Sequence, residues 1–259
     1  MIAEVEIVKV FLLVGIRFSG LILTAPILGS ANFPAIGKIG LIGMFAFLMT
    51  PTLPVLDTPL PDNALEFGLM GASELAIGLV MGLVMTLTFS AIQVAGQLMD
   101  MQSGFGLMNV FNPAFETQFP IFGFFYFILA VLFLLITNGH HLMIKALAST
   151  FETIPLGGLE ADVNLIGHMS TWGTMMFYDG LMIAAPVMAA MLLAYVTMGL
   201  MGRVVPQIHL FVVGFPITIA TALLIVALTI DYYLAYLDGM FVGMFRNVDT
   251  LINGLGPGA

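Results

Sequence analysis

The sequence contains no cysteine, few charged residues and very few basic ones. The absence of cysteine excludes disulfide bonds, thiolate metal ligands and a cysteine nucleophile. Lysine and arginine number six together and are scattered, which argues against a nucleic-acid-binding protein, since such proteins carry a basic patch or stripe. Charged residues make up 8% of the 259 residues, whereas soluble domains contain about 25%. Most of the surface therefore does not face water.

Apolar residues, by contrast, make up 60% of the chain. A helix needs roughly 20 apolar residues to cross a bilayer. Segments of about this length or longer cover residues 10–28, 39–56, 67–99, 119–137, 172–201 and 209–230. They should be helices, because lipid offers backbone groups no hydrogen-bonding partner. The sequence predicts an all-α polytopic membrane protein, with a single membrane domain over residues 1–259.

The basic residues do not orient this expected domain. If all six segments span the membrane, Lys38 and Arg203 lie on one side and Lys9, Lys145 and Arg246 on the other. Because the basic residues are divided almost evenly between the two sides, the positive-inside rule favours neither orientation. We take it as an indication that the final position of the chain depends on partner proteins.

Three charged residues interrupt the apolar segments: Arg17, Glu74 and Asp179. A charge near the centre of a bilayer costs roughly 2.5–3.5 kcal/mol on insertion scales. Each of these side chains therefore needs a protein partner or water.

Glu74 lies on a helical face that is otherwise made of small residues. Gly71, Gly78 and Gly82 share this face at spacings of three and four, which lets another backbone approach closely. The pattern is compatible with a helix-packing face that holds a buried, satisfied carboxylate. An ion or proton relay and a salt bridge between subunits are the two alternatives.

Pro186 and Pro216 lie well inside two of the long apolar segments. Pro186 frees the carbonyl of Met182, and Pro216 frees that of Val212, because proline lacks the backbone N–H. Gly214 next to Pro216 weakens the helix further. We expect helix kinks or breaks at Pro186, Gly214 and Pro216, with protein or water nearby to satisfy the freed groups.

The connection over residues 100–118 is unusually apolar for a loop. Gly104 and Gly106 flank Phe105 and should interrupt any helix. The loop also carries flexible or bulky apolar side chains at Met101, Met108, Phe111 and Phe115. It could pack against neighbouring helices, or it could form an apolar plug that blocks ions by dewetting.

Signatures of catalysis and metal binding are missing from the sequence. No HExxH motif surrounds any of the four histidines, and no Gly-x-Ser-x-Gly motif occurs. We therefore expect no catalytic residues, no metal site and no cofactor.

Four stretches in a fixed order extend over nearly the whole chain. They are Arg17 with Ala25-Pro26, Pro34 and Lys38; residues 74–78 with 95–97 and 104–106; residues 138–141 with 149–155; and residues 202–207 with 214–216. Together they resemble the FliR/SctT family. The amino-acid sequence of the last stretch is closer to the flagellar branch of this family than to the virulence branch. Asn112-Pro113 departs from the Asp-Pro that this family often has, which puts any salt bridge at that position in doubt.

The resemblance implies a subunit of a type III protein export gate. Such a subunit assembles with FliP and FliQ homologues, contacts an FlhB homologue, and consists of FliP-like and FliQ-like helical hairpins. It resides in the bacterial inner membrane within the flagellar basal body, and the assembled core can be raised toward the periplasm. Unfolded export substrates pass through its pore, and no nucleic acid is involved.

The resemblance also assigns roles to individual residues. The candidate plug would contain Gly104, Phe105, Gly106, Met108, Phe111, Asn112, Pro113 and Phe115. The buried charges used in assembly would be Arg17, Lys38, Glu74, Asp179 and Arg203. The alternatives are a virulence export gate, a secondary transporter with broken helices, and an intramembrane enzyme that uses His140, His141 and Asp179.

Overall fold

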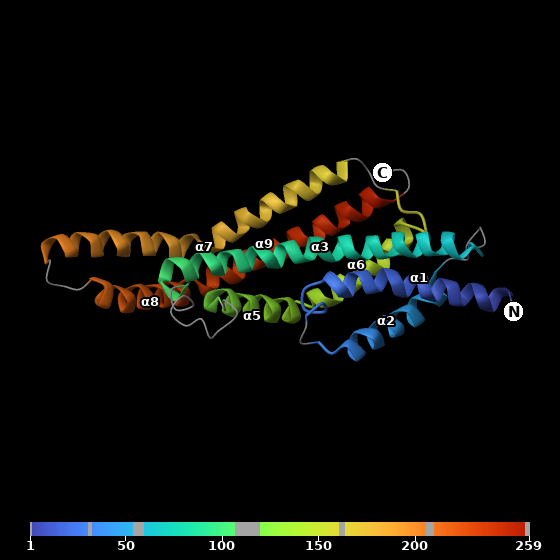
Figure 1. Ribbon diagram of the computed structural model, residues 1–259, viewed down its shortest axis with the longest axis horizontal. Coiled ribbons are helices and arrows are strands. Elements are labelled where there is room, and N and C mark those ends of the chain that lie inside the picture. Colours follow the sequence, from blue (N-terminus) through green and yellow to red (C-terminus); the bar gives the residue numbers. More distant parts are fainter. Residues whose placement is uncertain are drawn as a thin grey trace. The chain divides into compact units, whose positions relative to one another are not determined.

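The computed structural model describes residues 2–30, 33–53, 60–106, 120–160, 164–205 and 210–256. Its regular elements in these ranges are helices, which Figure 1 colours from α1 in blue to α9 in red. They are α1 (Ile2–Thr24), α2 (Ala35–Met49), the short 3-10 helix η1 (Thr50–Thr52), α3 (Ala64–Ser103), α5 (Ile121–Ile136), α6 (Gly139–Thr153), α7 (Asn164–Val204), α8 (Leu210–Leu228) and α9 (Ile230–Leu255).

Among the described residues, four helical stretches are long and apolar enough to cross a membrane. They are Val5–Thr24, Ala35–Thr52, Ala64–Ser103 and Gly167–Val204. The pairs α5–α6 and α8–α9 meet the same criterion only jointly, because each pair is bent at a short break. The described chain thus has four candidate spans, or up to six if each bent pair is one span. The prediction of an all-α polytopic membrane protein is confirmed.

The helices differ from the predicted apolar segments mainly at their ends. Helix α3 continues to Ser103, so residues 100–103 of the expected loop are helical. Gly104 then adopts a φ of 91°, which only glycine reaches without strain, and this residue ends α3. The break between α5 and α6 falls at Asn138, whose left-handed φ of 57° is one that asparagine tolerates.

The chain divides into two compact units. The first contains Met1–Leu87, Asn138–Trp172 and Val242–Ala259, and the second contains Thr88–Thr137 and Gly173–Phe241. In the first unit, α1 packs against α2, and the stacked rings of Phe18 and Phe45 are 3.9 Å apart. Val14, Ala46 and Phe151 form a small buried apolar cluster beside them.

Several aromatic side chains contact one another in the interior of the second unit. The ring of Phe89 lies 5.8 Å from that of Phe127 and 5.5 Å from that of Phe241. The buried hydroxyl of Tyr233 donates a hydrogen bond of 2.7 Å to the carbonyl of Tyr126. Buried tyrosines need such partners, because an unpaired hydroxyl in an apolar interior is costly.

Candidate functional site

Arg17 on α1 and Glu74 on α3 form an ion pair in the interior of the first unit. Arg17 Nε donates to Glu74 Oε2 over 2.5 Å, and both side chains are 0% exposed. Each side chain thus supplies the counter-charge that the other needs. Removing one partner of such a pair leaves an uncompensated buried charge, which costs about 3–5 kcal/mol in soluble proteins.

The other donors of the Arg17 guanidinium are also used. Nη1 donates to Thr150 Oγ1 over 3.0 Å, and Nη2 donates to the carbonyl of Ile154 over 3.1 Å. The guanidinium carbon lies 4.1 Å from the centroid of the Phe151 ring, a favourable cation–π position. Arg17 therefore joins α1 to the last turn of α6 as well as to α3.

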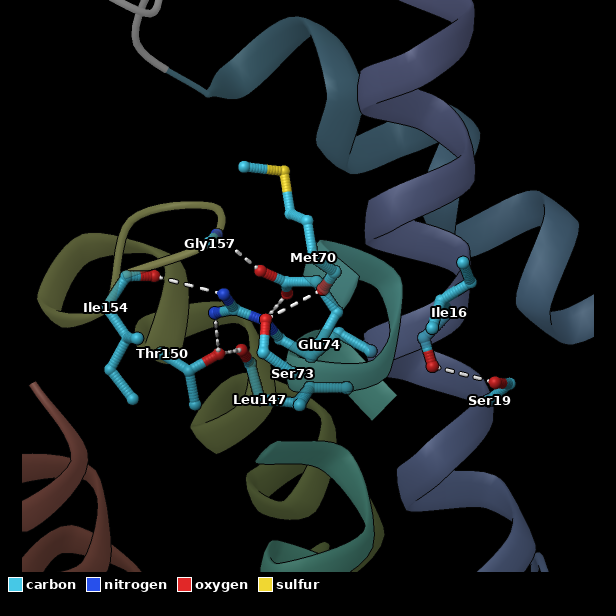
Figure 2. Close-up of polar contacts among 10 residues, drawn as sticks. Ile16, Ser19, Met70, Ser73, Glu74, Leu147, Thr150, Ile154 and Gly157 are labelled. Atoms are coloured by element: carbon cyan, nitrogen blue, oxygen red, sulfur yellow. Dashed lines mark hydrogen bonds and ion pairs between the residues drawn. The ribbon is translucent and has the colours of Figure 1, made fainter. Parts of the chain in front are cut away.

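The second oxygen of Glu74 has its own partner. Oε1 accepts a hydrogen bond of 2.8 Å from the backbone N–H of Gly157, in the turn that follows α6 (Figure 2). Gly157 has a φ of 76°, and a Cβ there would overlap the side chain of Met70. Because both carboxylate oxygens accept hydrogen bonds from fixed protein donors, the geometry favours the packing interpretation of Glu74 over the ion relay.

The glycines beside Glu74 lie where α1 and α3 come closest. A Cβ at Gly78 would overlap the carbonyl oxygen of Arg17, and one at Gly82 would overlap the hydroxyl of Thr24. Thr24 Oγ1 in turn donates to the carbonyl of Leu79 over 3.3 Å. Glycine at these positions is thus what allows the backbones to approach closely enough for the ion pair to form.

Of the three remaining predicted charges, Lys38 belongs to the first unit, and Asp179 and Arg203 belong to the second. Lys38 donates to the carbonyl of Gly29 over 3.0 Å and so ties the start of α2 to the turn after α1. Asp179 on α7 accepts a hydrogen bond of 2.8 Å from the hydroxyl of Tyr236 on α9. Arg203 is exposed in the last turn of α7, where a positive charge complements the helix dipole.

The helices continue through the predicted break residues. Pro186 lies inside α7, and Gly214 and Pro216 lie inside α8, so neither helix is interrupted there. Near Pro186 a side chain satisfies the freed group, because the hydroxyl of Tyr232 donates to the carbonyl of Met182 over 3.4 Å. A local bend at these prolines stays a prediction.

The start of the candidate plug contacts two helices of the second unit. A Cβ at Gly104 would lie 3.1 Å from the ring of Phe215 on α8. The ring of Phe105 meets that of Phe122 on α5 edge-on, with centroids 5.4 Å apart. Gly106 is helical, like Phe105. The other predicted plug residues lie outside the described part of the chain: Met108, Phe111, Asn112, Pro113 and Phe115.

Asp100 was not among the predicted site residues, yet it is a buried carboxylate. It is 5% exposed, and its Oδ1 accepts a hydrogen bond of 3.2 Å from the backbone N–H of Phe122. It thereby caps α5, whose own preceding residue, Pro120, forms no side-chain cap. Because Asp100 and Phe122 are 22 residues apart in the sequence, no local sequence pattern indicates that Asp100 caps α5.

No metal centre is found in the part of the chain that the structure describes. Histidines, aspartates and glutamates do not gather there in groups of three or more that could hold an ion. The fold and the site thus define a polytopic helical membrane protein whose buried charges are held by structural contacts.

Comparison with known proteins supplies the family. Residues 8–244 match the family described as "Bacterial export proteins, family 1". The chain is 31% identical over 241 residues to the "Flagellar biosynthetic protein FliR" of Escherichia coli (strain K12), covering 93% of this chain and 91% of that protein. It is 29% identical over 256 residues to the protein of the same name from Bacillus subtilis (strain 168), covering 96% and 97%. It is 33% identical over 233 residues to the protein of the same name from Pectobacterium carotovorum subsp. carotovorum, covering 89% of this chain and 87% of that protein.

The chain belongs to this family of bacterial export proteins. The resemblance to FliR that the four ordered sequence stretches indicate is thereby confirmed.

Proposed function

We propose that the chain is a structural and channel-forming subunit of the flagellar type III export gate in the bacterial inner membrane. The observation that carries the proposal is the family match, which covers residues 8–244 and therefore nearly every candidate membrane span. The relatives named above are flagellar biosynthetic proteins, which favours the flagellar over the virulence system. The gate passes unfolded flagellar proteins and needs no catalytic residue of its own.

The proposed partners are FliP and FliQ homologues in the core complex and an FlhB homologue beside it. Many large apolar side chains remain exposed on the isolated chain, for example Leu192, Leu193, Val196, Leu224 and Val242. Surfaces of this kind require lipid or partner subunits as neighbours. The proposed location is the basal body, where the assembled core can be raised toward the periplasm.

Within this assembly, residues 104–115 serve as the plug of the closed channel. Support comes from the start of the segment, where Gly104 packs on Phe215 and Phe105 packs on Phe122. These contacts fix one end of the apolar sequence that contains Met108 and Phe111. Phenylalanine and methionine side chains exclude water from a narrow passage, and the flexibility of methionine lets such a seal yield to a passing chain.

Deletion of the gene tests the proposal. The deletion strain should lack flagellar filaments and should not export hook protein, and a plasmid copy of the chain should restore both. A deletion strain that swims normally would contradict the proposed function.

A further inference from the structure

The end of α3 and the start of α5 meet in a closely packed junction within the second unit. Gly96 on α3 and Gly123 on α5 lie backbone to backbone, because a Cβ at Gly96 would overlap the main chain of Gly123. One turn further along α3, Asp100 Oδ1 accepts the hydrogen bond from the N–H of Phe122. We call these four residues, Gly96, Asp100, Phe122 and Gly123, the α3–α5 junction.

The carbonyl groups at the end of α3 have partners of their own. Ser103 is fully buried, and its hydroxyl donates to the carbonyl of Asp100 over 3.3 Å. The hydroxyl of Tyr195 on α7 donates to the carbonyl of Gln102. Because the last carbonyls of a helix lack partners within the helix, these two hydroxyls hold the end of α3 in place. The junction thus joins two helix ends whose backbone groups are satisfied by side chains.

Stability alone does not explain a carboxylate at position 100. The side chain is 5% exposed, and its second oxygen, Oδ2, is buried without a hydrogen-bond partner among the described residues. The ion pairs of the described part of the chain do not include Asp100. A buried acceptor without a partner is destabilising, and such a group in a native structure calls for an explanation.

The junction adjoins both described ends of the sequence that contains the candidate plug. At the first end, the ring of Phe105 meets that of Phe122 edge-on. At the second end, Pro120 directly precedes α5, whose first turn Asp100 caps. Residues 107–119 between these ends lie outside the described part of the chain. One carboxylate thus links the two points at which this sequence leaves the helices and rejoins them.

We infer that Asp100 is a positioning residue of the closed gate. Its hydrogen bond to Phe122 holds the start of α5 against the end of α3, so the apolar sequence between the two helices is attached at fixed points. Fixed attachment suits a seal, since a dewetted constriction blocks ions only while its apolar side chains stay close together. The inference deepens the proposed function and rests on it, because it assumes that this sequence contains the plug.

Conductance of the purified complex in a planar bilayer tests this role. Asp100→Leu removes the acceptor at similar side-chain size. Its closed-state conductance should rise about tenfold, the change expected when a charge-assisted hydrogen bond that favours one of two states is lost. Asp100→Asn keeps an acceptor oxygen for the N–H of Phe122, so its conductance should stay within about twofold of that of the unsubstituted complex.

Tyr233→Phe is the matched control for a general loss of stability. It also removes one buried hydrogen bond to α5, from the Tyr233 hydroxyl to the carbonyl of Tyr126, but at a position beyond the junction. Thermal unfolding of each complex is measured beside its conductance. We expect Tyr233→Phe to lower the unfolding temperature without raising conductance. A leak in this variant as large as that of Asp100→Leu would overturn the inference, because any loosening of the unit would then open the gate.

Two results at position 100 also overturn the inference. One is a closed-state conductance of Asp100→Leu equal to that of the unsubstituted complex, and the other is a leak in Asp100→Asn as large as in Asp100→Leu. If Asp100→Leu does not assemble, Asp100→Glu replaces it, because the extra methylene displaces the carboxylate while keeping its charge. Asp100→Glu should then leak, and its failure to assemble or to leak would leave Asp100 with a structural role only.

The alanine double variant of Met108 and Phe111 separates this inference from the proposed function. If that variant leaks and Asp100→Leu does not, the plug stands and the positioning role of Asp100 is wrong. If neither variant leaks, the plug itself is wrong and the inference fails with it. A leak in both variants, with Asp100→Asn and Tyr233→Phe closed, is the result that the inference predicts.

Discussion

The carboxylate of Glu74 lies 2.5 Å from the guanidinium Nε of Arg17, although 57 residues separate the two in the sequence. This contact converts two charges that would each be unfavourable in an apolar segment into a link between α1 and α3. The same arginine reaches Thr150 and Ile154 at the end of α6. Arg17 and Glu74 thus link three helices of the first unit, α1, α3 and α6.

Neutralising Glu74 should destabilise the chain and its assembly. We expect Glu74→Gln to lower the yield of assembled complex severalfold, because Arg17 would keep a buried charge without its counter-ion, at a cost of about 3–5 kcal/mol. Thermal unfolding of the complex in detergent measures the effect. Glu66→Gln, an exposed position on the same helix, is the matched control. Intact, equally stable assembly of Glu74→Gln would contradict a structural role for the pair.

Enlarging Gly78 should separate α1 from α3. A Cβ at this position would overlap the backbone of Arg17, so Gly78→Ala should lower stability by several kcal/mol or prevent folding. Gly68→Ala on the same helix is the control, since nothing lies within 4 Å of its Cβ position. That variant should be neutral or up to about 1 kcal/mol more stable, because alanine favours helix. Equal stability of the two variants would show that the helices do not approach closely at Gly78.

The hydroxyl of Tyr232 should matter only while Pro186 is present. Tyr232→Phe removes the donor to the carbonyl of Met182 and should cost about 0.5–1.5 kcal/mol. In a Pro186→Ala background the backbone N–H of residue 186 can satisfy that carbonyl, so the same change should cost less. A double-mutant cycle from thermal unfolding measures the difference. An identical cost in both backgrounds would exclude this coupling.

Reducing the apolar side chains of the candidate plug should make the closed gate leak. Changing Met108 and Phe111 to alanine together removes bulk from the proposed seal, so ions should pass in the absence of substrate. Conductance of the reconstituted complex in a planar bilayer measures the leak. The control is Met44→Ala, which shortens an exposed methionine on α2. Conductance of the double variant equal to that of the unsubstituted complex would count against a sealing role.

Sequence patterns predicted the helices and the packing face well, because both follow from local composition. The glycines beside Glu74 indicated a close helix contact, and the structure places α1 against that face. The partner of Glu74 could not be predicted, since the pairing with Arg17 depends on how distant helices fold together. The same holds for Asp100, whose hydrogen bond to Phe122 becomes apparent only in three dimensions.

The predicted breaks at the prolines show a different limit. A proline removes one backbone hydrogen bond, but the sequence does not reveal whether another group replaces it. At Pro186 the hydroxyl of Tyr232 satisfies the freed carbonyl, and α7 continues to Val204. The break between α5 and α6 instead falls at Asn138, where the backbone adopts a left-handed conformation.

Purification of the chain with its neighbours tests the central claim most directly. The tagged chain is extracted in mild detergent from membranes that contain its natural partners, and the product is analysed by mass spectrometry and electron microscopy. The account predicts a stable complex with FliP and FliQ homologues that encloses a closed central channel. A chain that purifies alone and by itself carries out solute uptake in liposomes would contradict it and would identify a transporter instead.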